Sequence, residues 1–200
     1  MRDETEQWPV VATEEEYRNG LIAVRSDTVR FPDDSQAERT VVHHPGAVAV
    51  VALDDAQRVL MIRQYRHPVG RKLWEIPAGL RDVDGEDLLV TAQRELVEET
   101  GYRAREWHVL ADWFTSPGFC DEKIRCFLAR GLAEVPDVER TFVMTHEEAF
   151  LESAWVGLET AVTAVLRGDM HNGVTAMGIL AVYAAASGGF ASLRPADSLE

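Results

Sequence analysis

Three glutamates near the end of one predicted helix have the residue type and spacing to do chemistry. Glu95, Glu98 and Glu99 fall within the stretch "RELVEET", where Arg94 is the adjacent cation. Successive helical residues turn by about 100°, so Glu95 and Glu99 share a face and Glu98 stays within reach of the same ion. Like charges at this spacing repel, whereas carboxylate oxygens are the ligands that Mg²⁺ prefers. The cluster predicts either a solvated acidic face or a divalent-cation site.

The segment that carries these glutamates has the pattern of a helix that follows a loop. The loop "LRDVDG" precedes a helix expected over about residues 86–100, and Gly101 stands where a left-handed residue commonly ends a helix. Leu89, Ala92 and Leu96 recur at helical spacing and predict the buried face. The glutamates are therefore expected on a helix that its apolar face anchors to the core.

The other apolar runs predict mostly strands first and helices last. Residues 1–20 are polar, with Trp8 and Tyr17 as isolated aromatics, and residues 21–31 have the composition of a strand pair. Two further runs separated by the turn "DDAQ" predict a hairpin. Strands are expected at 39–53, 58–66, 72–79, 107–114, 123–132 and 153–158, and helices at 159–169 and 172–189. This order predicts an α+β fold with packed layers.

Composition and charge restrict the class of protein. The chain has 200 residues, enough for one domain with a sizeable core, and its formal charge of −14 argues against binding to nucleic acid or to an anionic membrane surface. The two cysteines, Cys120 and Cys126, make no disulfide framework, which favours the reducing cytoplasm. Neither a secretory signal nor an apolar run of about twenty residues is visible. We therefore expect a cytoplasmic globular protein.

The stretch from Gly79 to Tyr102 resembles the Nudix hydrolase box. The family pattern is a glycine, five residues, a glutamate, seven residues, and then Arg-Glu-aliphatic-x-Glu-Glu-x-Gly-aliphatic. Here six residues separate Gly79 from Glu86, and seven more precede the run from Arg94 to Gly101. The additional loop residue and Tyr102 at the last aliphatic position depart from the pattern. The helix register is unaffected, so this context favours the cation site over the solvated face.

The resemblance implies a fold and a cofactor. The fold is a Nudix α/β/α sandwich, with a mixed sheet between helices and an N-terminal antiparallel strand extension. The box helix is implied to bind Mg²⁺ or Mn²⁺, which would neutralise diphosphate oxygens and activate water. Arg94 and Glu86 are expected to brace the loop against the helix. The implied metal ligands are the carbonyl of Ala78 and the carboxylates of Glu95, Glu98 and Glu99.

Stretches outside the box narrow the resemblance to the ADP-ribose pyrophosphatase branch. "RQYRHPVGRKLWEIPAG" resembles the arginine-bearing strand and box lead-in of that branch, and Pro117 lies sixteen residues after Gly101, where the branch carries a marker proline. Arg66 is implied to contact the diphosphate. Taken alone, Arg66 also suits a surface arginine, and residues 116–118 suit a plain turn. The implied terminal-ribose site comprises Leu80, Ser116, Gly118 and Glu122.

Hydrolysis also requires a group that activates water. The branch places a catalytic glutamate on a loop after the box, and the acidic stretch "THEEAF" stands at the matching place. Glu148 fits best by its spacing before Trp155, and Glu147 is the alternative. The resemblance thus implies Glu148, with Glu99 at the metal, as catalytic residues. The histidines show no metal-ligand spacing and are expected to be structural or on the surface.

The branch also implies a homodimer with exchanged N-terminal strands. Residues 1–42 are expected to form the strand extension, 43–190 the Nudix domain and 191–200 a frayed tail. Arg39 matches an arginine that reaches the partner's substrate. Trp8 and Tyr17 are both candidates to hold the adenine.

The function implied is divalent-metal-dependent hydrolysis of ADP-ribose to AMP and ribose 5-phosphate. One alternative is a Nudix pyrophosphatase for another nucleoside diphosphate sugar, which the Ser-Pro-Gly marker disfavours. Another is a noncatalytic ADP-ribose sensor, which would be expected to have a degraded box and a fused DNA-binding domain. Here the box glutamates are intact, so the enzyme is favoured.

Overall fold

The computed structural model of the protein describes residues 1–83, 85–139 and 150–198. The chain forms two compact units. The N-terminal unit consists of Met1–Gly46 and Phe114–Glu122, and the main unit consists of Ala47–Trp113 and Lys123–Glu200. No helix in the described residues is both long and apolar enough to cross a membrane.

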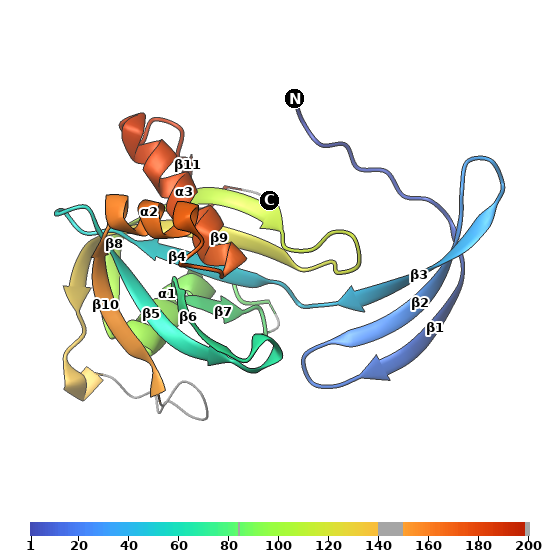
Figure 1. Cartoon of the computed structure of the whole chain (residues 1–200), viewed down its shortest axis with the longest axis horizontal. Coiled ribbons are helices and arrows are strands. Elements are labelled where there is room, and N and C mark those ends of the chain that lie inside the picture. Colours follow the sequence, from blue (N-terminus) through green and yellow to red (C-terminus); the bar gives the residue numbers. More distant parts are fainter. Residues whose placement is uncertain (84, 140–149, 199–200) are drawn as a thin grey trace. The chain divides into compact units, whose positions relative to one another are not determined.

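The N-terminal unit is built on a three-stranded antiparallel sheet. Strands β1 (Val10–Arg18), β2 (Ala23–Arg30) and β3 (Gln36–His43) pair in the order β1-β2-β3 (Figure 1). The strand pair expected over residues 21–31 is wrong, because those residues form the single strand β2. Its partner β1 lies in the polar N-terminal segment and has every residue exposed. This strand forms through backbone hydrogen bonds to β2, which cannot be predicted from a pattern of apolar residues.

The segment 114–122 is fastened to the end of β3 in the same unit. The Val42 N–H donates to the Phe119 carbonyl at 2.7 Å, and the Asp121 N–H donates to the Val42 carbonyl at 3.2 Å. The Asp121 carboxylate also accepts the His44 N–H at 2.9 Å and lies 2.7 Å from His43 Nδ1. These hydrogen bonds give the two histidines a structural role, as their sequence context predicted.

The main unit contains two sheets. The larger is mixed, in the order β11-β8-β9-β4-β7, with β4 parallel to β9 and antiparallel to β7. The smaller is antiparallel, in the order β10-β5-β6. The bounds are β4 Ala47–Ala52, β5 Arg58–Arg66, β6 Arg71–Glu75, β7 Ala78–Leu80, β8 Tyr102–Phe114, β9 Lys123–Glu134, β10 Glu152–Gly157 and β11 Arg194–Pro195; short 3-10 helices span His67–Val69 and Asp137–Glu139.

The predicted hairpin between β4 and β5 is a tight turn whose strands diverge. The Asp54 N–H donates to the Arg58 carbonyl at 3.0 Å, and Leu53 and Val59 form an antiparallel bridge. Beyond that bridge β4 joins the five-stranded sheet and β5 the three-stranded one. The turn is local in sequence, whereas the choice of partner strands depends on distant segments.

Strand β4 lies at the centre of the core and separates two apolar layers. Val48 and Val50 pack in one cluster with Ala92 and Leu96 of α1 (Leu88–Thr100). The alternate residues of β4 pack in a second cluster with α2 (Leu158–Arg167) and α3 (Gly173–Ser187), including Ile179. Because alternate side chains of a strand point to opposite faces, α1 and α3 cover opposite sides of the sheet. The predicted α+β sandwich with a mixed sheet between helices and an N-terminal strand extension is confirmed.

Candidate active site

Helix α1 is fixed at both ends by local hydrogen bonds. The Asp87 carboxylate accepts the Leu89 N–H at 2.8 Å, which caps the first turn. Gly101 adopts φ 72°, and its N–H donates to the Val97 carbonyl at 2.8 Å. Only glycine adopts this left-handed conformation without a steric penalty. The helix therefore ends where the sequence predicts, with Glu95, Glu98 and Glu99 in its last two turns.

The box glycine and the helix meet at close range. The Glu95 side chain lies over the backbone of Gly79, so that a Cβ at position 79 would overlap the Glu95 carboxyl group. Next to it, Glu99 Oε2 accepts the Ala78 N–H at 2.9 Å. Two of the three predicted metal-binding glutamates are thereby held against strand β7. The Ala78 carbonyl of this strand is also a predicted ligand. The absence of a side chain at Gly79 is a requirement of this packing.

Arg94 holds the glutamates of α1 together. Its Nη1 donates to Glu95 Oε1 at 2.6 Å and to Glu98 Oε2 at 3.2 Å, and its Nη2 donates to Glu86 Oε2 at 3.1 Å. Glu86 also accepts the Thr91 hydroxyl at 2.8 Å. The additional residue in the box loop therefore leaves Glu86 in place, and the predicted bracing of loop against helix is present.

The electrostatics of the cluster reflect burial and charge crowding. Burial raises the pKa of Glu95 to about 7, Arg94 opposes that rise, and the neighbouring Glu98 adds to it. Hydrogen bonds from Arg94 and Thr91 hold the pKa of Glu86 below its usual value. Arg94 therefore offsets only part of the free-energy cost of ionising the Glu95 carboxyl group. A further cation beside it would lower that cost.

The donor set suits a hard divalent cation. Glu95 and Glu98 both reach the same nitrogen of Arg94, so their carboxylates already converge on one positive group. Carboxylate and carbonyl oxygens with room for water are the surroundings that Mg²⁺ prefers. Within the described ranges no three acidic, histidine or cysteine side chains are arranged around a common point. Arg94 contacts Glu95 and Glu98, and the Ala78 N–H contacts Glu99. The residues fit the cation by their chemistry, and binding would require these carboxylates to turn from their present partners.

Arg66 and Leu80 are the other predicted site residues in the main unit. Arg66 ends β5, and its Nε and Nη2 donate to the two carboxylate oxygens of Glu75 at 2.9 and 2.6 Å. Glu75 is buried, with 2% of its surface exposed. A paired, two-point contact fixes the plane of the guanidinium. Leu80 ends β7 opposite Ala47. Glu75 was not identified from the sequence. The signal that could have identified it was a charged residue within an apolar strand.

The remaining described candidates lie in the N-terminal unit. Glu122 Oε2 accepts the Thr115 hydroxyl at 2.6 Å, and the Ser116 carbonyl accepts the N–H of Cys120 at 2.9 Å, which closes the turn that contains Gly118. On β3, the Arg39 guanidinium carbon lies 5.3 Å from the centroid of the Phe31 ring. The predicted ribose-site residues after the box therefore share one short, internally hydrogen-bonded turn. The predicted water-activating residue, Glu148, and its alternative Glu147 fall outside the described residues.

A mixed-sheet sandwich, with a glutamate-bearing helix packed against the backbone of Gly79, is the arrangement that the Nudix box implies. The sequence model of the NUDIX domain matches residues 43–174. This match covers more than half of the chain, and the chain belongs to the Nudix hydrolase family. Enzymes of this family generally need divalent metal ions.

Individual relatives extend the similarity across nearly the whole chain. The ADP-ribose pyrophosphatase of Mycobacterium tuberculosis (strain ATCC 25618 / H37Rv) is 46% identical over 188 residues, which are 94% of this chain and 88% of the relative. The ADP-ribose pyrophosphatase of Bacillus subtilis (strain 168) is 36% identical over 84% of this chain and 89% of its own length. A solved structure titled as that of an ADP compounds hydrolase superposes with a TM-score of 0.74 at 19% identity, covering 94% of this chain and 98% of the other. The structural likeness supports the fold.

Proposed function

We propose that this enzyme hydrolyses the diphosphate bond of ADP-ribose, giving AMP and ribose 5-phosphate. The observation that carries the proposal is the 46% identity, over 94% of the chain, to a relative named ADP-ribose pyrophosphatase. A second relative with the same name aligns over 84% of the chain. The intact glutamate cluster on α1 supports hydrolysis rather than binding alone.

The proposed cofactor is Mg²⁺ or Mn²⁺. The residues that would hold it are the Ala78 carbonyl and the carboxylates of Glu95, Glu98 and Glu99. When bound, the cation would neutralise diphosphate oxygens and lower the pKa of a bound water. Glu98 accepts a hydrogen bond from Arg94 at 3.2 Å, and Glu99 accepts one from the Ala78 N–H at 2.9 Å. Both contacts are single hydrogen bonds, which small side-chain rotations can exchange for ligation.

The chain's own residues prepare the site in three ways. Arg94 keeps Glu95 and Glu98 on one side of α1, and it offsets their mutual repulsion before any cation arrives. Gly79 leaves the space that Glu95 occupies. The Ala78 N–H orients Glu99. Each of these contacts keeps the carboxylates beside one another, and cation binding would then require them to turn from these partners.

Substrate contacts are proposed for two groups of residues. Arg66, oriented by Glu75, is proposed to bind the diphosphate, since a guanidinium suits two-point contacts with phosphate oxygens. Glu122 is proposed to read a ribose hydroxyl, for which a carboxylate is a strong acceptor. Glu148, or in its place Glu147, is proposed to activate water. Ser116 and Gly118, which lie in the same turn as Glu122, are proposed to complete this contact.

We also propose that the enzyme is a cytoplasmic homodimer with exchanged N-terminal strands. Strand β1 is an edge strand with every residue exposed, and exposed apolar side chains such as Val10, Val11 and Tyr17 lie on it. Exposed edge strands of this kind are usually covered by another chain or protected. Residues 1–42 would be the exchange element, with Arg39 reaching the partner's substrate and Trp8 or Tyr17 holding the adenine. The proposed Nudix domain spans 43–190. Residues 191–200, expected as a frayed tail, include β11 (Arg194–Pro195), which pairs with β8 in the main unit.

A substrate panel tests the proposed function. Steady-state rates are measured with ADP-ribose, ADP-glucose and GDP-mannose, and products are identified by chromatography. The expected result is the highest kcat/KM with ADP-ribose, with AMP and ribose 5-phosphate as products. A preference for GDP-mannose would refute the substrate and leave the family unaffected. Full activity in excess chelator would refute the metal.

Two variants separate binding from chemistry. Glu148→Gln should lower kcat strongly with little change in KM, because a water-activating group acts on the reacting atoms. Glu122→Gln should weaken ADP-ribose and spare poorer substrates, because an unpaired ribose hydroxyl is costly only for the substrate that carries it. Near-normal kcat in Glu148→Gln would transfer the role to Glu147 or to a metal-bound hydroxide acting alone.

A further inference from the structure

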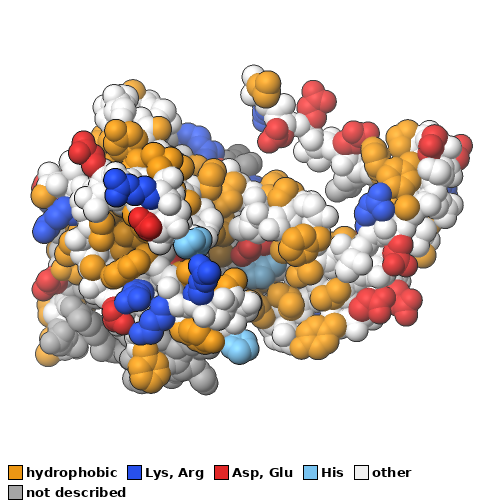
Figure 2. Space-filling model, viewed as in Figure 1, with side chains coloured by type: hydrophobic (Ala, Val, Ile, Leu, Met, Phe, Trp, Pro, Cys, Tyr) orange, Lys and Arg blue, Asp and Glu red, His pale blue; other side chains and the backbone are white. Residues whose placement is uncertain are grey.

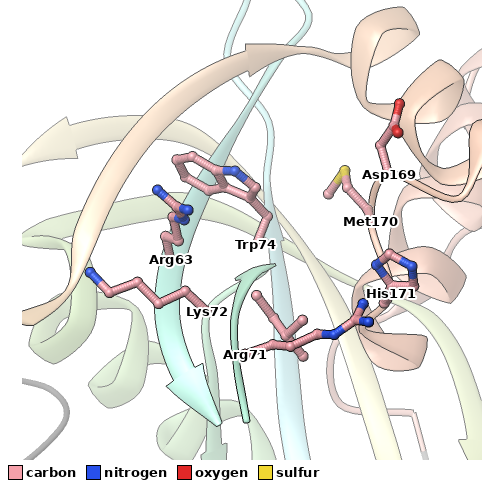
Figure 3. A pocket seen from close by; sticks show the side chains of 8 residues that line it. Arg63, Arg71, Lys72, Trp74, Asp169, Met170 and His171 are labelled. Carbon is pink, nitrogen blue, oxygen red and sulfur yellow. The ribbon is translucent and has the colours of Figure 1, made fainter. Parts of the chain in front are cut away.

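The main unit contains a second concave site that the proposed chemistry does not use. Its volume is about 510 Å³, and it lies between strands β5 and β6 and the connection from α2 to α3. Figure 3 shows the side chains of β5 and β6 on one side and those of the connection on the other. Its lining residues are Arg63, Arg71, Lys72, Leu73, Trp74, Asp169, Met170 and His171.

The part of this pocket formed by Arg63 and Trp74 lies on the opposite face of β5 and β6 from the Arg66–Glu75 pair. Alternate residues of a strand share a face, so Arg63 shares the face of Met61, which packs in the α3-side cluster. Trp74 is opposite Arg63 in the ladder and packs on the same cluster. Arg66 instead shares the face of Leu60, which packs in the α1-side cluster. Arg63 and Trp74 are therefore separate from the predicted diphosphate contact, whereas Arg71 is opposite Arg66 at the end of the ladder.

The charges around the pocket are unusual for this chain. Arg63 and Lys72 share one carboxylate, that of Glu152, at 3.7 and 2.9 Å. Among the described residues, Arg71 and His171 have no acidic partner within ion-pair distance. With Asp169 counted, three permanent cations face two carboxylates. The pocket thus carries a positive charge on a chain whose formal charge is −14, and lysine and arginine side chains gather on this face of the main unit in Figure 2.

The pocket also has an aromatic and apolar floor. Trp74 and Met170 pack against the α3-side core cluster, and this packing restricts their positions. The Arg63 guanidinium carbon lies 5.7 Å from the centroid of the Trp74 ring, a cation–π contact that orients the arginine at the rim. Cations held over an immobile apolar surface suit a ligand with a compact anionic group.

We propose that this pocket is a second binding site, for a phosphate-bearing ligand, separate from the glutamate cluster. Arg71 and Lys72 would supply the charge-assisted contacts, with His171 at the opposite wall. The shared chemistry is a phosphate group, which inorganic phosphate and a nucleoside monophosphate both present. The apolar side chains of Trp74 and Met170 would add contact area only for the nucleotide. This proposal is independent of the substrate assigned to the enzyme.

The test is a titration of the whole chain in excess chelator, with inorganic phosphate and AMP as separate probes. The chelator removes divalent cations and so weakens the binding of phosphate and AMP at the glutamate cluster. The ring signals of His171 are followed by NMR and assigned with His171→Gln. A saturable shift is expected with phosphate. Arg71→Ala should weaken it about tenfold, the loss expected for one charge-assisted hydrogen bond.

Arg167→Ala is the matched control. Arg167 lies at the exposed end of α2, outside the pocket lining, and its removal changes the net charge by the same amount. It should leave the titration unchanged. Because Arg71 is exposed, its variant should fold normally, which thermal unfolding checks. An absent or non-saturating His171 shift, or equal weakening in Arg71→Ala and Arg167→Ala, would overturn the proposal.

The two probes identify the source of the phosphate. Tighter binding of AMP than of phosphate, lost in Trp74→Leu, would assign a nucleotide whose base contacts the indole. Equal binding of both probes would assign the phosphate group alone. Either result supports the site.

Discussion

The N-terminal sheet and the main unit differ in how their strands are stabilised. Every residue of β1 is exposed, whereas all six residues of β4 are buried and pack helices on both faces. Burial of apolar surface contributes roughly 25 cal/mol per Å², so β4 is stabilised within one chain. β1 is paired by backbone hydrogen bonds on one edge alone. The difference supports the proposed dimer, because within the described part of the chain the exposed surface of β1 is free of the contacts that bury β4.

This comparison extends to the predicted site residues. Those of the main unit, such as Glu95 and Glu99, are held by contacts with distant parts of the chain. Arg39, in the N-terminal unit, contacts the adjacent Glu38 carbonyl and the Phe31 ring. We therefore expect substitutions in the main unit to affect chemistry or stability strongly. Substitutions in the N-terminal unit should affect binding.

The largest effect is expected for Glu99→Gln. A glutamine can still accept the Ala78 N–H, so the fold should be retained, while the loss of a metal-binding carboxylate should lower kcat by roughly a hundredfold or more. Removing one of three crowded carboxylates should also leave the metal-free protein equally or slightly more stable. Steady-state kinetics and thermal unfolding measure both quantities. Normal kcat would contradict the assignment.

Gly79→Ala should separate geometry from stability in the same region. The new methyl group would overlap the Glu95 carboxyl group, which is the end of a flexible side chain and can rotate away. We expect kcat to fall by about tenfold, as for other misplaced catalytic groups, with little loss of stability. Gly20→Ala is the control, because nothing lies within 4 Å of a Cβ there. Equal activities of the two variants would show that the position of Glu95 is unimportant.

Leu96→Ala should measure how far the main unit depends on its core. Leu96 is fully buried on α1, and truncation of such a leucine costs about 2–5 kcal/mol in free energy of unfolding. Denaturant titration measures the loss. Val90→Ala on the exposed side of the same helix is the control and should cost far less. Similar losses at both positions would contradict the packing described here.

Asp112→Asn should break a buried charge network in the main unit. Asp112 accepts hydrogen bonds from Arg125 at 2.8 Å and from Arg194 at 2.7 Å, and Arg125 is 4% exposed. Leaving Arg125 without its carboxylate should cost about 3 kcal/mol in free energy of unfolding. Arg103, an exposed arginine paired with Glu139, offers the control variant Glu139→Gln, which should cost less than about 1 kcal/mol.

The same network predicts a dependence of stability on pH. Burial acts to raise the pKa of Asp112, but the hydrogen bonds from Arg125 and Arg194 outweigh it and hold the pKa below the usual value. The folded protein therefore releases this proton more readily than the unfolded chain. The stabilisation is complete above the unfolded pKa of 3.8 and is lost as pH falls below it. Unfolding curves between pH 3 and pH 6 should show a smaller acid loss in Asp112→Asn.

The smallest effect is expected for Arg39→Ala in the N-terminal unit. Arg39 is exposed on β3, so its removal should change the stability by less than about 0.5 kcal/mol. If it reaches the partner's substrate, KM should rise more than kcat falls. Sedimentation at assay concentration measures the oligomeric state alongside. A fully active monomer would contradict the proposed dimer and the role of Arg39.

Residues close together in the sequence were predicted well. The end of α1, the position of Gly101 and the helical stripe of Ala92 and Leu96 agree with the structure, and the helix begins at Leu88, two residues after the expected start. Their hydrogen bonds join residues within four positions of each other, so the local sequence contains all the information. Strand β1 was missed because its residues are held by a partner strand and show no apolar alternation.

The sequence by itself determined the glutamate spacing, the helix that carries it and the family resemblance. Only the tertiary structure decided which distant groups meet these residues, such as the Ala78 N–H at Glu99 and the buried Glu75 at Arg66. It also decided the pocket that joins Arg63 and Trp74 to His171. The physical reason is that helix caps and spacing depend on hydrogen bonds between near neighbours. Contacts between distant segments form because apolar layers are buried on both faces of β4. No short stretch of sequence specifies both partners of such a contact.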